Sequence, residues 1–395
     1  MSKVREQYEA YPYPERDPKD EKTRLITGSP SLPQEIDHYL FCGARDWRAP
    51  LRILVAGGGT GDGLIQLTAL LTQYKKPYEA TYIDLSTSSR SIAEARAKMR
   101  GLNNIRFITG SLLDAAEHGP FDYIDCCGVL HHLPDPDAGF AALRAAIAPA
   151  GGMGFMVYAP YGRSGVYPLQ EAFGALFSDM SPKDKLSAAQ KLFEKLPDSH
   201  PFKANANLSE HKNGEAGFYD LLLHSQDRAY DVASLLDTLT GTGWHFSGFT
   251  VPALYDLSRW TSPPSSMSEA EAMATAERLI GTIRTHTGYA AAEERAPATG
   301  QNRALVPHLK GVQVAALASA VAQGQKVALG SDGLNGTVDL PPAAGRLIAA
   351  IDGRRTLTEI AATTGQDPFS FGAAWTKIEA QLMPWGMLLY SSVLR

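Results

Sequence analysis

Residues 51–61, LRILVAGGGTG, place a short apolar segment directly before four glycines in five positions. A continuous apolar run predicts a strand of a parallel sheet, which is buried on both faces. The next segment, GLIQLTALLTQY, has the apolar spacing of a helix. A strand, a glycine turn and a helix in this order let a ligand approach bare backbone at a helix N-terminus. The stretch therefore predicts an α/β fold with a ligand-binding turn.

A second predicted strand, ATYID, ends in Asp84, 23 residues after Gly61. A carboxylate at this position can accept hydrogen bonds from both hydroxyls of a ribose. Gly57, Gly59 and Gly61 have G-x-G-x-G spacing, tighter than the dinucleotide G-x-G-x-x-G, which favours a compact group against the turn rather than a pyrophosphate. The two features together predict a cofactor that contains a nucleoside. The alternative is a tight structural turn, with Asp84 there by coincidence.

Strand and helix patterns alternate over residues 51–159. The expected strands are RILVA, ATYID, IRFIT, YIDCCGV and MGFMVYA, and the helices between them include SRSIAEARAKM and AGFAALRAAIA. This alternation predicts a doubly wound, mostly parallel α/β sheet. Composition shifts predict five segments: an N-terminal lid or arm at 1–50, a main domain at 51–260, a cap inserted at 160–230, a helical linker at 261–304 and a small α+β domain at 305–395.

Composition limits the classes of function. The net charge is −5 and no basic stripe is present, so a broad phosphate-backbone footprint and nucleic-acid binding are not expected. Cys42, Cys126 and Cys127 lack metal-ligand spacing and are interpreted as reduced thiols. The sequence shows neither an apolar signal core at its start nor a segment long enough to cross a membrane. A cytoplasmic protein that acts on a small molecule is expected.

Five motifs, ILVAGGGTG, YIDLS, IRFITGSLLD, FDYIDCCGVLHHLPDP and LRAAIAPAGGM, occur in this order. They resemble the successive motifs of class I S-adenosylmethionine-dependent methyltransferases and cover about residues 45–160. The resemblance implies the Rossmann-like methyltransferase fold and S-adenosyl-L-methionine as cofactor. In one departure, Val55 stands where the family usually has an acidic residue that steadies the methionine end of the cofactor. The opening VREQYEAYPYP resembles the lead-in of a bacterial subgroup of these enzymes.

The resemblance implies a set of cofactor contacts at the ends of the first four strands. They are Ala56, Gly57, Gly59, Gly61, Asp84, Leu85, Ser111, Leu112, Gly128 and Val129. The glycine turn would face the methionyl part and Asp84 the ribose. Ser111, which replaces the usual aspartate, and Leu112 would hold the adenine. Gly128 and Val129 would lie beneath the sulfonium.

His131 and His132 follow the fourth strand, where the family has the mouth of its site. One imidazole is a candidate general base toward a thiol, hydroxyl or amine. Alternatively, both histidines only shape the pocket wall, because the sulfonium is already a strong electrophile and positioning supplies most of the rate. A metal is not expected, since no third ligand at a fitting spacing is nearby.

Three further segments are candidates for acceptor contacts. Their candidate residues are Tyr158, Tyr161 and Arg163 after the fifth strand, Tyr8, Tyr11 and Tyr13 near the N-terminus, and His224 and Arg228 at the close of the cap. Arg163 could hold a carboxylate or phosphate in a bidentate fork. The N-terminal tyrosines suggest a lid that donates hydroxyls, Tyr13 included, or a surface arm that packs on the core. An internal Asp–Arg salt bridge is the alternative for residues 218–232.

The C-terminal IDGRRTLTEIAATTG resembles small winged-helix-like modules. A dimerisation or substrate-recognition domain is expected there, and a homodimer through it is one candidate assembly. The leading hypothesis for the chain is methyl transfer to a small-molecule sulfur, nitrogen or oxygen. The alternatives are methyl transfer to a protein or tRNA through the C-terminal domain, and a cofactor-binding regulator without catalysis.

Overall fold

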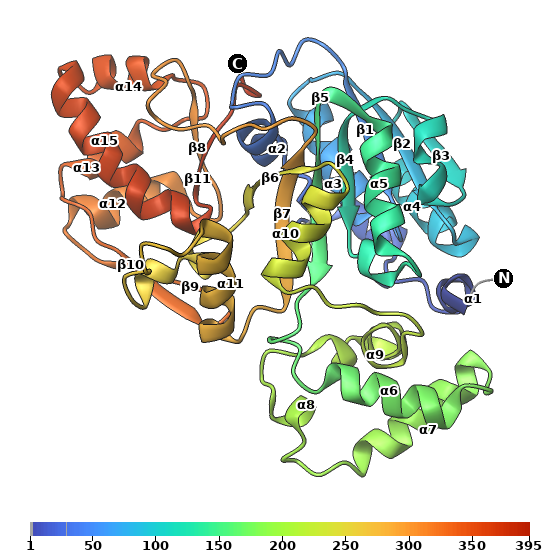
Figure 1. The fold of residues 1–395 in the computed structure, drawn as a ribbon. Coiled ribbons are helices and arrows are strands. Elements are labelled where there is room, and N and C mark those ends of the chain that lie inside the picture. Colours follow the sequence, from blue (N-terminus) through green and yellow to red (C-terminus); the bar gives the residue numbers. More distant parts are fainter. Residues whose placement is uncertain (1–2, 29) are drawn as a thin grey trace.

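A computed structural model describes residues 3–28 and 30–395 (Figure 1). Its centre is a seven-stranded sheet in the order β3-β2-β1-β4-β5-β7-β6. The strands are β1 (Leu51–Ala56), β2 (Tyr78–Asp84), β3 (Ile105–Thr109), β4 (Phe121–Cys127), β5 (Ile147–Tyr158), β6 (His245–Phe249) and β7 (Thr285–Ala291). β1 to β5 pair in parallel, whereas β7 runs antiparallel to both β5 and β6. The predicted doubly wound, mostly parallel sheet is confirmed.

Helices cover both faces of this sheet, as a parallel sheet requires. They are α3 (Asp62–Gln73), α4 (Thr87–Met99), α5 (Pro136–Ala146) and α10 (Val232–Gly241), with short 3-10 turns η2 (Leu112–Glu117) and η3 (Leu130–His132). Alternating residues of β1 enter two different cores: Leu54 packs with Ile124 and Phe155, whereas Ile53 packs with Tyr82. The parallel strands therefore all end on one edge of the sheet, between these layers.

Residues 261–304 are not the helical linker that the sequence predicted. They contain α11 (Glu269–Ile280) and then β7, which lies inside the central sheet. α11 begins with a capping box of Ser268 and Glu271 and ends at Gly281, which has φ 63°. The strand β7 was not predicted because its sequence, THTGYAA, is only weakly apolar. Glycine is needed at position 288 of β7, since a Cβ there would lie 2.8 Å from the Gly248 carbonyl oxygen of β6.

The first 50 residues are not a single lid either. α1 (Lys3–Ala10) and the 3-10 turn η1 (Pro18–Lys22) form a surface arm, but α2 (Pro33–Leu40) is buried along its whole length. Within α2, Ile36 and Leu40 belong to the same core as β1. Asp37 accepts hydrogen bonds from Trp47 Nε1 and Ser391 Oγ. α2 therefore joins the sheet to the C-terminal end of the chain.

The inserted segment forms a helical lobe on the side of the sheet where β5 ends (Figure 1). Its elements are α6 (Val166–Phe177), α7 (Pro182–Glu194), α8 (Pro201–Ala204), η4 (Glu210–Lys212) and α9 (Gly214–Leu223). This lobe, called the cap below, has its own apolar core that includes Leu169, Phe173 and Phe218. Two short turns, η5 (Pro252–Tyr255) and η6 (Leu257–Arg259), follow β6.

The C-terminal region has a separate core around Trp375 and Ile378. Its elements are β8 (Pro307–Leu309), α12 (Val314–Ala322), β9 (Val327–Ser331), β10 (Leu334–Val338), α13 (Ala344–Ala349), α14 (Leu357–Thr363), α15 (Pro368–Leu382), η7 (Met383–Trp385) and β11 (Leu388–Tyr390). β9 and β10 form an antiparallel hairpin, and its turn residues Asp332 and Gly333 both have positive φ. The winged-helix-like likeness stays a prediction. None of the described helices is both long and apolar enough to cross a membrane.

Candidate active site

The glycine turn after β1 is shaped by close contacts that exclude side chains. Gly57, Gly59 and Gly61 have φ values of 66°, 50° and 100°. A Cβ on Gly57 would lie 2.6 Å from both methyl groups of Val129, and one on Gly58 would lie 2.3 Å from the ring of Tyr82. The turn leads into α3, with Gly61 as its N-cap. Backbone N–H groups are therefore presented at a helix start, as an anionic ligand group requires.

Asp84 at the end of β2 is tied to this turn. Its Oδ2 accepts from Gly59 N at 2.8 Å, and its Oδ1 accepts from Ser86 N at 2.8 Å. Burial raises the pKa of the Asp84 carboxyl, and the two backbone hydrogen bonds oppose that rise. Leu85 beside it is exposed. Asp84 therefore aligns the glycine turn with the start of α4 and keeps acceptor capacity for a ribose.

The remaining predicted cofactor residues lie on the same edge of the sheet. Ser111 Oγ accepts from Leu113 N and caps η2, and Leu112 is buried behind it. Gly128 has φ 79°, which an L side chain rarely adopts. Val129 packs against Gly57. The structure thus brings the ends of β1, β2, β3 and β4 together, while the role of each residue remains a proposal.

The N-terminal arm crosses this edge. The Tyr8 carbonyl accepts from Ser86 Oγ, and the Pro14 carbonyl accepts from Thr60 Oγ1 at 2.7 Å. The Glu9 carboxylate accepts from Thr87 N and Ser88 N, the first N–H groups of α4. These bonds lower the pKa of Glu9, with the Ser88 hydroxyl as the largest cause. The arm is therefore docked on the same turn and helix that would hold the cofactor.

Ion pairs hold the base of the arm in place. Arg16 donates from Nε and Nη2 to the Asp62 carboxylate, the latter at 2.7 Å. Arg96, which is fully buried, donates to Asp62 at 2.7 Å and to Glu21 at 2.8 Å. Such buried pairs cost desolvation energy, so their clear consequence is a defined geometry rather than added stability. They orient the chain leading to Tyr13 and Tyr8.

Polar rings from the sheet and the cap meet beyond the ends of β4 and β5. The His131 ring centroid lies 4.1 Å from that of His132 and 4.0 Å from that of Tyr158. His132 stacks on His224 of the cap with ring centroids 3.7 Å apart. These four side chains, His131, His132, Tyr158 and His224, are called the histidine cluster below. Sequence positions about 90 apart thus form one site.

The arm and α9 complete the histidine cluster. The Tyr8 hydroxyl donates to Asp220 Oδ1 at 3.1 Å and lies 3.3 Å from His224 Nε2. Burial raises the pKa of both Tyr8 and Asp220. Burial also lowers the pKa of His131 and His224, with the neighbouring His132 as the next cause. His131 and His224 are therefore neutral near pH 7.

Hydrogen bonds to Gln226 assign the ring protons of two histidines. The Gln226 carbonyl is 3.0 Å from His132 Nδ1 and can only accept, so this nitrogen carries the proton. Gln226 N donates to His224 Nδ1, which leaves the proton of that ring on Nε2. Among the described residues, neither ring nitrogen of His131 has a hydrogen-bond partner. The lone pair of the His131 ring is thus not used by any described protein group.

The expectation that no third metal ligand lies near His131 and His132 was wrong. Two sets, His131–His132–Asp227 and His132–Asp220–His224, have candidate ligand atoms within 4.8 Å of one another. The third members come from the cap, so sequence spacing could not show them. In the second set the ring nitrogens already serve Gln226 and Tyr8. Near the first set, the positive charge of the Arg163 guanidinium, 3.9 Å from Asp227, would repel a metal cation. The absence of a metal stays a prediction.

Several predicted acceptor residues lie away from the histidine cluster. The Tyr161 hydroxyl accepts from Arg278 Nε on α11 at 3.3 Å. Arg228 is exposed, with its guanidinium 5.1 Å from the Tyr230 ring centroid. Tyr11 stacks on Tyr219 of the cap. Arg163 does reach the cluster, 3.6 Å above the Tyr158 ring centroid. The structure therefore supports Arg163 and gives Tyr161 and Arg228 other surroundings.

Asp220 was missed as a site candidate, whereas Asp227 was expected only as one of the polar groups at the close of the cap. Asp220 bonds to Tyr8, and Asp227 lies 3.9 Å from Arg163 rather than pairing with Arg228 beside it in the sequence. The alternative of an internal Asp–Arg salt bridge in residues 218–232 is therefore wrong. The only sequence signal was their place among polar and aromatic residues in an otherwise apolar stretch.

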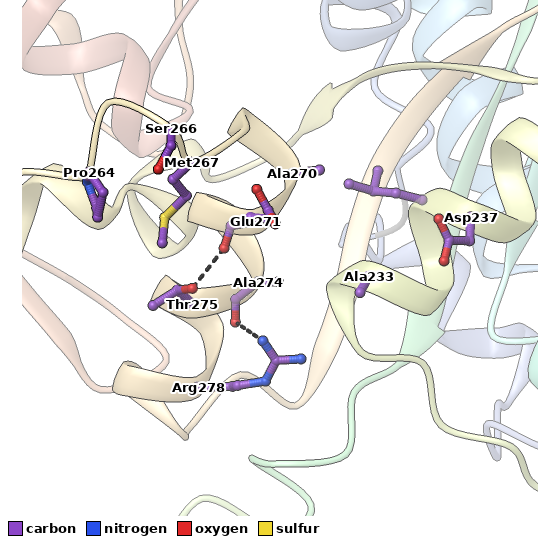
Figure 2. Close-up of a pocket in the computed structure, with 11 residues that line it drawn as sticks. Ala233, Asp237, Pro264, Ser266, Met267, Ala270, Glu271, Ala274, Thr275 and Arg278 are labelled. Carbon is purple, nitrogen blue, oxygen red and sulfur yellow. Dashed lines mark hydrogen bonds between the residues drawn. The ribbon is translucent and has the colours of Figure 1, made fainter.

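Two hollows differ in their relation to the site. One of about 500 Å³ lies between α10 and α11, and none of its lining residues is a predicted site residue (Figure 2). A second, of about 470 Å³, is lined by α1, α6, α7 and residues 224–227. It opens onto His224 and Asp227. The second hollow is thus the one that leads to the histidine cluster.

Comparisons with known proteins agree with this geometry. Residues 54–153 match the family model described as a methyltransferase domain. The uncharacterized protein syc1184_c of Synechococcus sp. is 33% identical over 264 residues, 64% of this chain and 60% of that protein. A ubiquinone biosynthesis O-methyltransferase of Paracidovorax citrulli is 33% identical over 111 residues, 27% of this chain and 44% of that protein. The chain thus spans less than two thirds of either relative.

A solved structure extends the likeness to most of the chain. PKMT2 from Rickettsia typhi in complex with AdoHcy has a TM-score of 0.62 with this structure. The match covers 93% of this chain and 77% of that chain, at 14% sequence identity, and therefore shows a shared fold. Together with the glycine turn, Asp84 and the matched domain, it confirms the resemblance of the motifs. The chain carries a class I S-adenosylmethionine-dependent methyltransferase domain, with S-adenosyl-L-methionine as its cofactor.

Proposed function

We propose that this protein transfers the methyl group of S-adenosylmethionine to a small-molecule nucleophile held in the histidine cluster. The observation that carries the proposal is the enclosure of this cluster. His131, His132 and His224 are each at most 5% exposed, beneath both the arm and the cap. His131 and His132 follow Val129 after one intervening residue, and His224 of the cap stacks on His132. An enclosed acceptor site favours a small molecule over a large folded surface.

The chain's own groups have three tasks in this reaction. The glycine turn, Asp84 and the loop of Ser111 would hold the cofactor, which supplies an electrophilic methyl group. The cap and arm would exclude water and keep the acceptor in line with the sulfonium, which supplies most of the rate. His131, neutral and without a partner among the described residues, would take the proton of the nucleophile.

Label transfer tests the proposal. The full chain is incubated with methyl-labelled S-adenosylmethionine and with separate low-molecular-weight, RNA and protein fractions of a cell extract. We expect label in the low-molecular-weight fraction. Label only in RNA or protein would reject the small-molecule acceptor and favour the macromolecular alternative. Cofactor binding without label in any fraction would favour the non-catalytic regulator.

A variant pair tests the role of His131. His131→Gln should keep affinity for S-adenosylhomocysteine but lower the labelling rate by about 100-fold, within the range for general acid–base catalysis. His245→Gln is the control, because His245 is exposed at the start of β6. An unchanged labelling rate in His131→Gln would mean that this histidine only forms part of the pocket wall.

A further inference from the structure

Arg163 is a buried cation whose hydrogen-bonding edge is unused. Its side chain is 2% exposed. Burial opposes its charge, but Tyr158, Tyr167, Asp227 and Glu210 together raise the pKa of the Arg163 guanidinium. Within residues 3–28 and 30–395, Nε and Nη2 have no hydrogen-bond partner. Its near carboxylate, Asp227, has Oδ2 3.9 Å from Nη2, which is too long for a hydrogen bond. A buried charge left in this state is costly, so a missing partner is indicated.

The two unused nitrogens form the side edge of the guanidinium, which is suited to a carboxylate. Three other arginines of this chain show what that edge binds. Nε and Nη2 of Arg16, Arg48 and Arg52 each donate to the carboxylate of one aspartate: Asp62, Asp46 and Asp122. Arg163 differs from them in that this edge makes no hydrogen bond among the described residues, and its nearest carboxylate, Asp227, is 3.9 Å away. The edge is therefore ready for an external carboxylate.

The surroundings of Arg163 place this edge in the acceptor site. The guanidinium carbon lies 3.6 Å above the Tyr158 ring centroid, and the Tyr158 ring is 4.0 Å from that of His131. The stacking holds the guanidinium plane and leaves its edge free. The second hollow reaches Asp227, the near neighbour of Arg163. The hollow is thus lined by the aspartate nearest to Arg163 and by His224 of the histidine cluster.

We infer that the methyl acceptor is a carboxylic acid whose carboxylate is held side-on by Nε and Nη2 of Arg163. The inference rests on the proposed function and names the acceptor class. The carboxylate is the anchor, and a second group of the same molecule is the nucleophile near His131. Arg163 is thus a specificity-determining residue, because neutral analogues would leave its charge unpaired.

Binding of acetate and acetamide tests the anchor without knowledge of the acceptor. Acetate has the carboxylate and acetamide is its neutral analogue of similar size. Saturation-transfer NMR would measure their dissociation constants for the full chain with saturating S-adenosylhomocysteine at constant ionic strength. We expect acetate to bind at least about tenfold more tightly than acetamide, as charged hydrogen bonds imply. Equal binding of the two would overturn the inference.

Matched variants assign the effect to the guanidinium edge. Arg163→Gln should weaken acetate by about 10- to 100-fold, and Arg163→Lys should weaken it less because the charge remains without the fork. Arg228→Gln is the control, since it removes an exposed arginine nearby. Melting temperature and S-adenosylhomocysteine affinity verify that each variant is folded. If Arg163→Gln does not fold, the comparison is made with Arg163→Lys. Acetate affinity unchanged in the folded Arg163 variant would overturn the inference.

A labelling experiment separates this inference from the proposed function. Low-molecular-weight extract is divided on an anion exchanger before methyl-labelled S-adenosylmethionine and the full chain are added. We expect label in the retained, anionic fraction, and loss of that label with Arg163→Gln. Label only in the unretained fraction would overturn the carboxylic acid acceptor but support the proposed function. Label in neither fraction would contradict the proposed function, while acetate binding would still test Arg163.

Discussion

Replacing Asp84 should weaken the cofactor product S-adenosylhomocysteine by an amount that the structure bounds. The carboxylate already accepts Gly59 N and Ser86 N, both at 2.8 Å, and has lone pairs left for a ribose. Asp84→Ala removes hydrogen bonds between a charged acceptor and the ribose, each worth about 1.5–3 kcal/mol. A loss of this size raises the dissociation constant by about 10- to 150-fold.

Asp84→Asn separates charge from geometry. One amide oxygen can still accept from Gly59 or Ser86, but the amide nitrogen cannot accept a ribose hydroxyl and the charge is gone. Its loss of affinity should therefore lie between those of the wild type and Asp84→Ala. Asp114→Ala is the matched control, because Asp114 is an exposed carboxylate in the first turn of η2.

Isothermal titration calorimetry of S-adenosylhomocysteine with the four proteins measures these affinities, and melting temperatures show whether each is folded. Asp114→Ala should match the wild type within about twofold, since a surface substitution changes little. The reasoning fails if folded Asp84→Ala and Asp84→Asn both bind as tightly as the control. In that case Asp84 would only align the glycine turn with α4.

Three further outcomes are expected. Deleting residues 1–14 should preserve the fold, since residues 3–14 contain no strand, but lower cofactor affinity and activity because Tyr8 and Glu9 no longer hold the arm on α4; full activity would make the arm a packing element. Burial lowers the pKa of His38 to about 4, below its ordinary 6.5. The unfolded chain then binds more protons between these pH values, so the free energy of unfolding should fall by up to about 3 kcal/mol as pH drops from 6.5 to 4. Denaturant titrations should show a smaller fall for His38→Asn, which keeps an acceptor for Tyr390 N; equal falls would contradict the assignment. Binding of tRNA in filter assays should be weak at physiological salt, since the net charge is −5; tight, steeply salt-dependent binding would contradict this.

The cofactor edge was predictable because its signals are local. A strand, a positive-φ turn and a helix N-terminus occupy consecutive residues around Gly57, Gly59 and Gly61, and Asp84 ends the next strand. In a parallel sheet the ends of neighbouring strands lie on one edge whatever the side chains are. Order along the chain therefore implied proximity in space. The same argument covers Ser111 and Gly128.

Elements with weak patterns were not predictable. β7 mixes threonine, histidine and tyrosine with glycine and alanine, so its sequence lacks the apolar alternation of a strand. α2 looks like part of a surface arm until the C-terminal strand β11 covers it. In both cases the burial comes from partners far away in the chain, and no local pattern records such partners.

The sequence by itself determined the fold class, the cofactor and the first pair of histidines, because strand order and turn chemistry are written in short segments. Tertiary structure alone decided what surrounds those histidines. The arm brings Tyr8 to Asp220 across 212 positions, and the cap brings His224 onto His132. Arg163 and Arg228 looked alike as candidates, yet one is buried beside Tyr158 and the other is exposed. Burial is set by long-range packing, and it is burial that turns a charged side chain into a binding site.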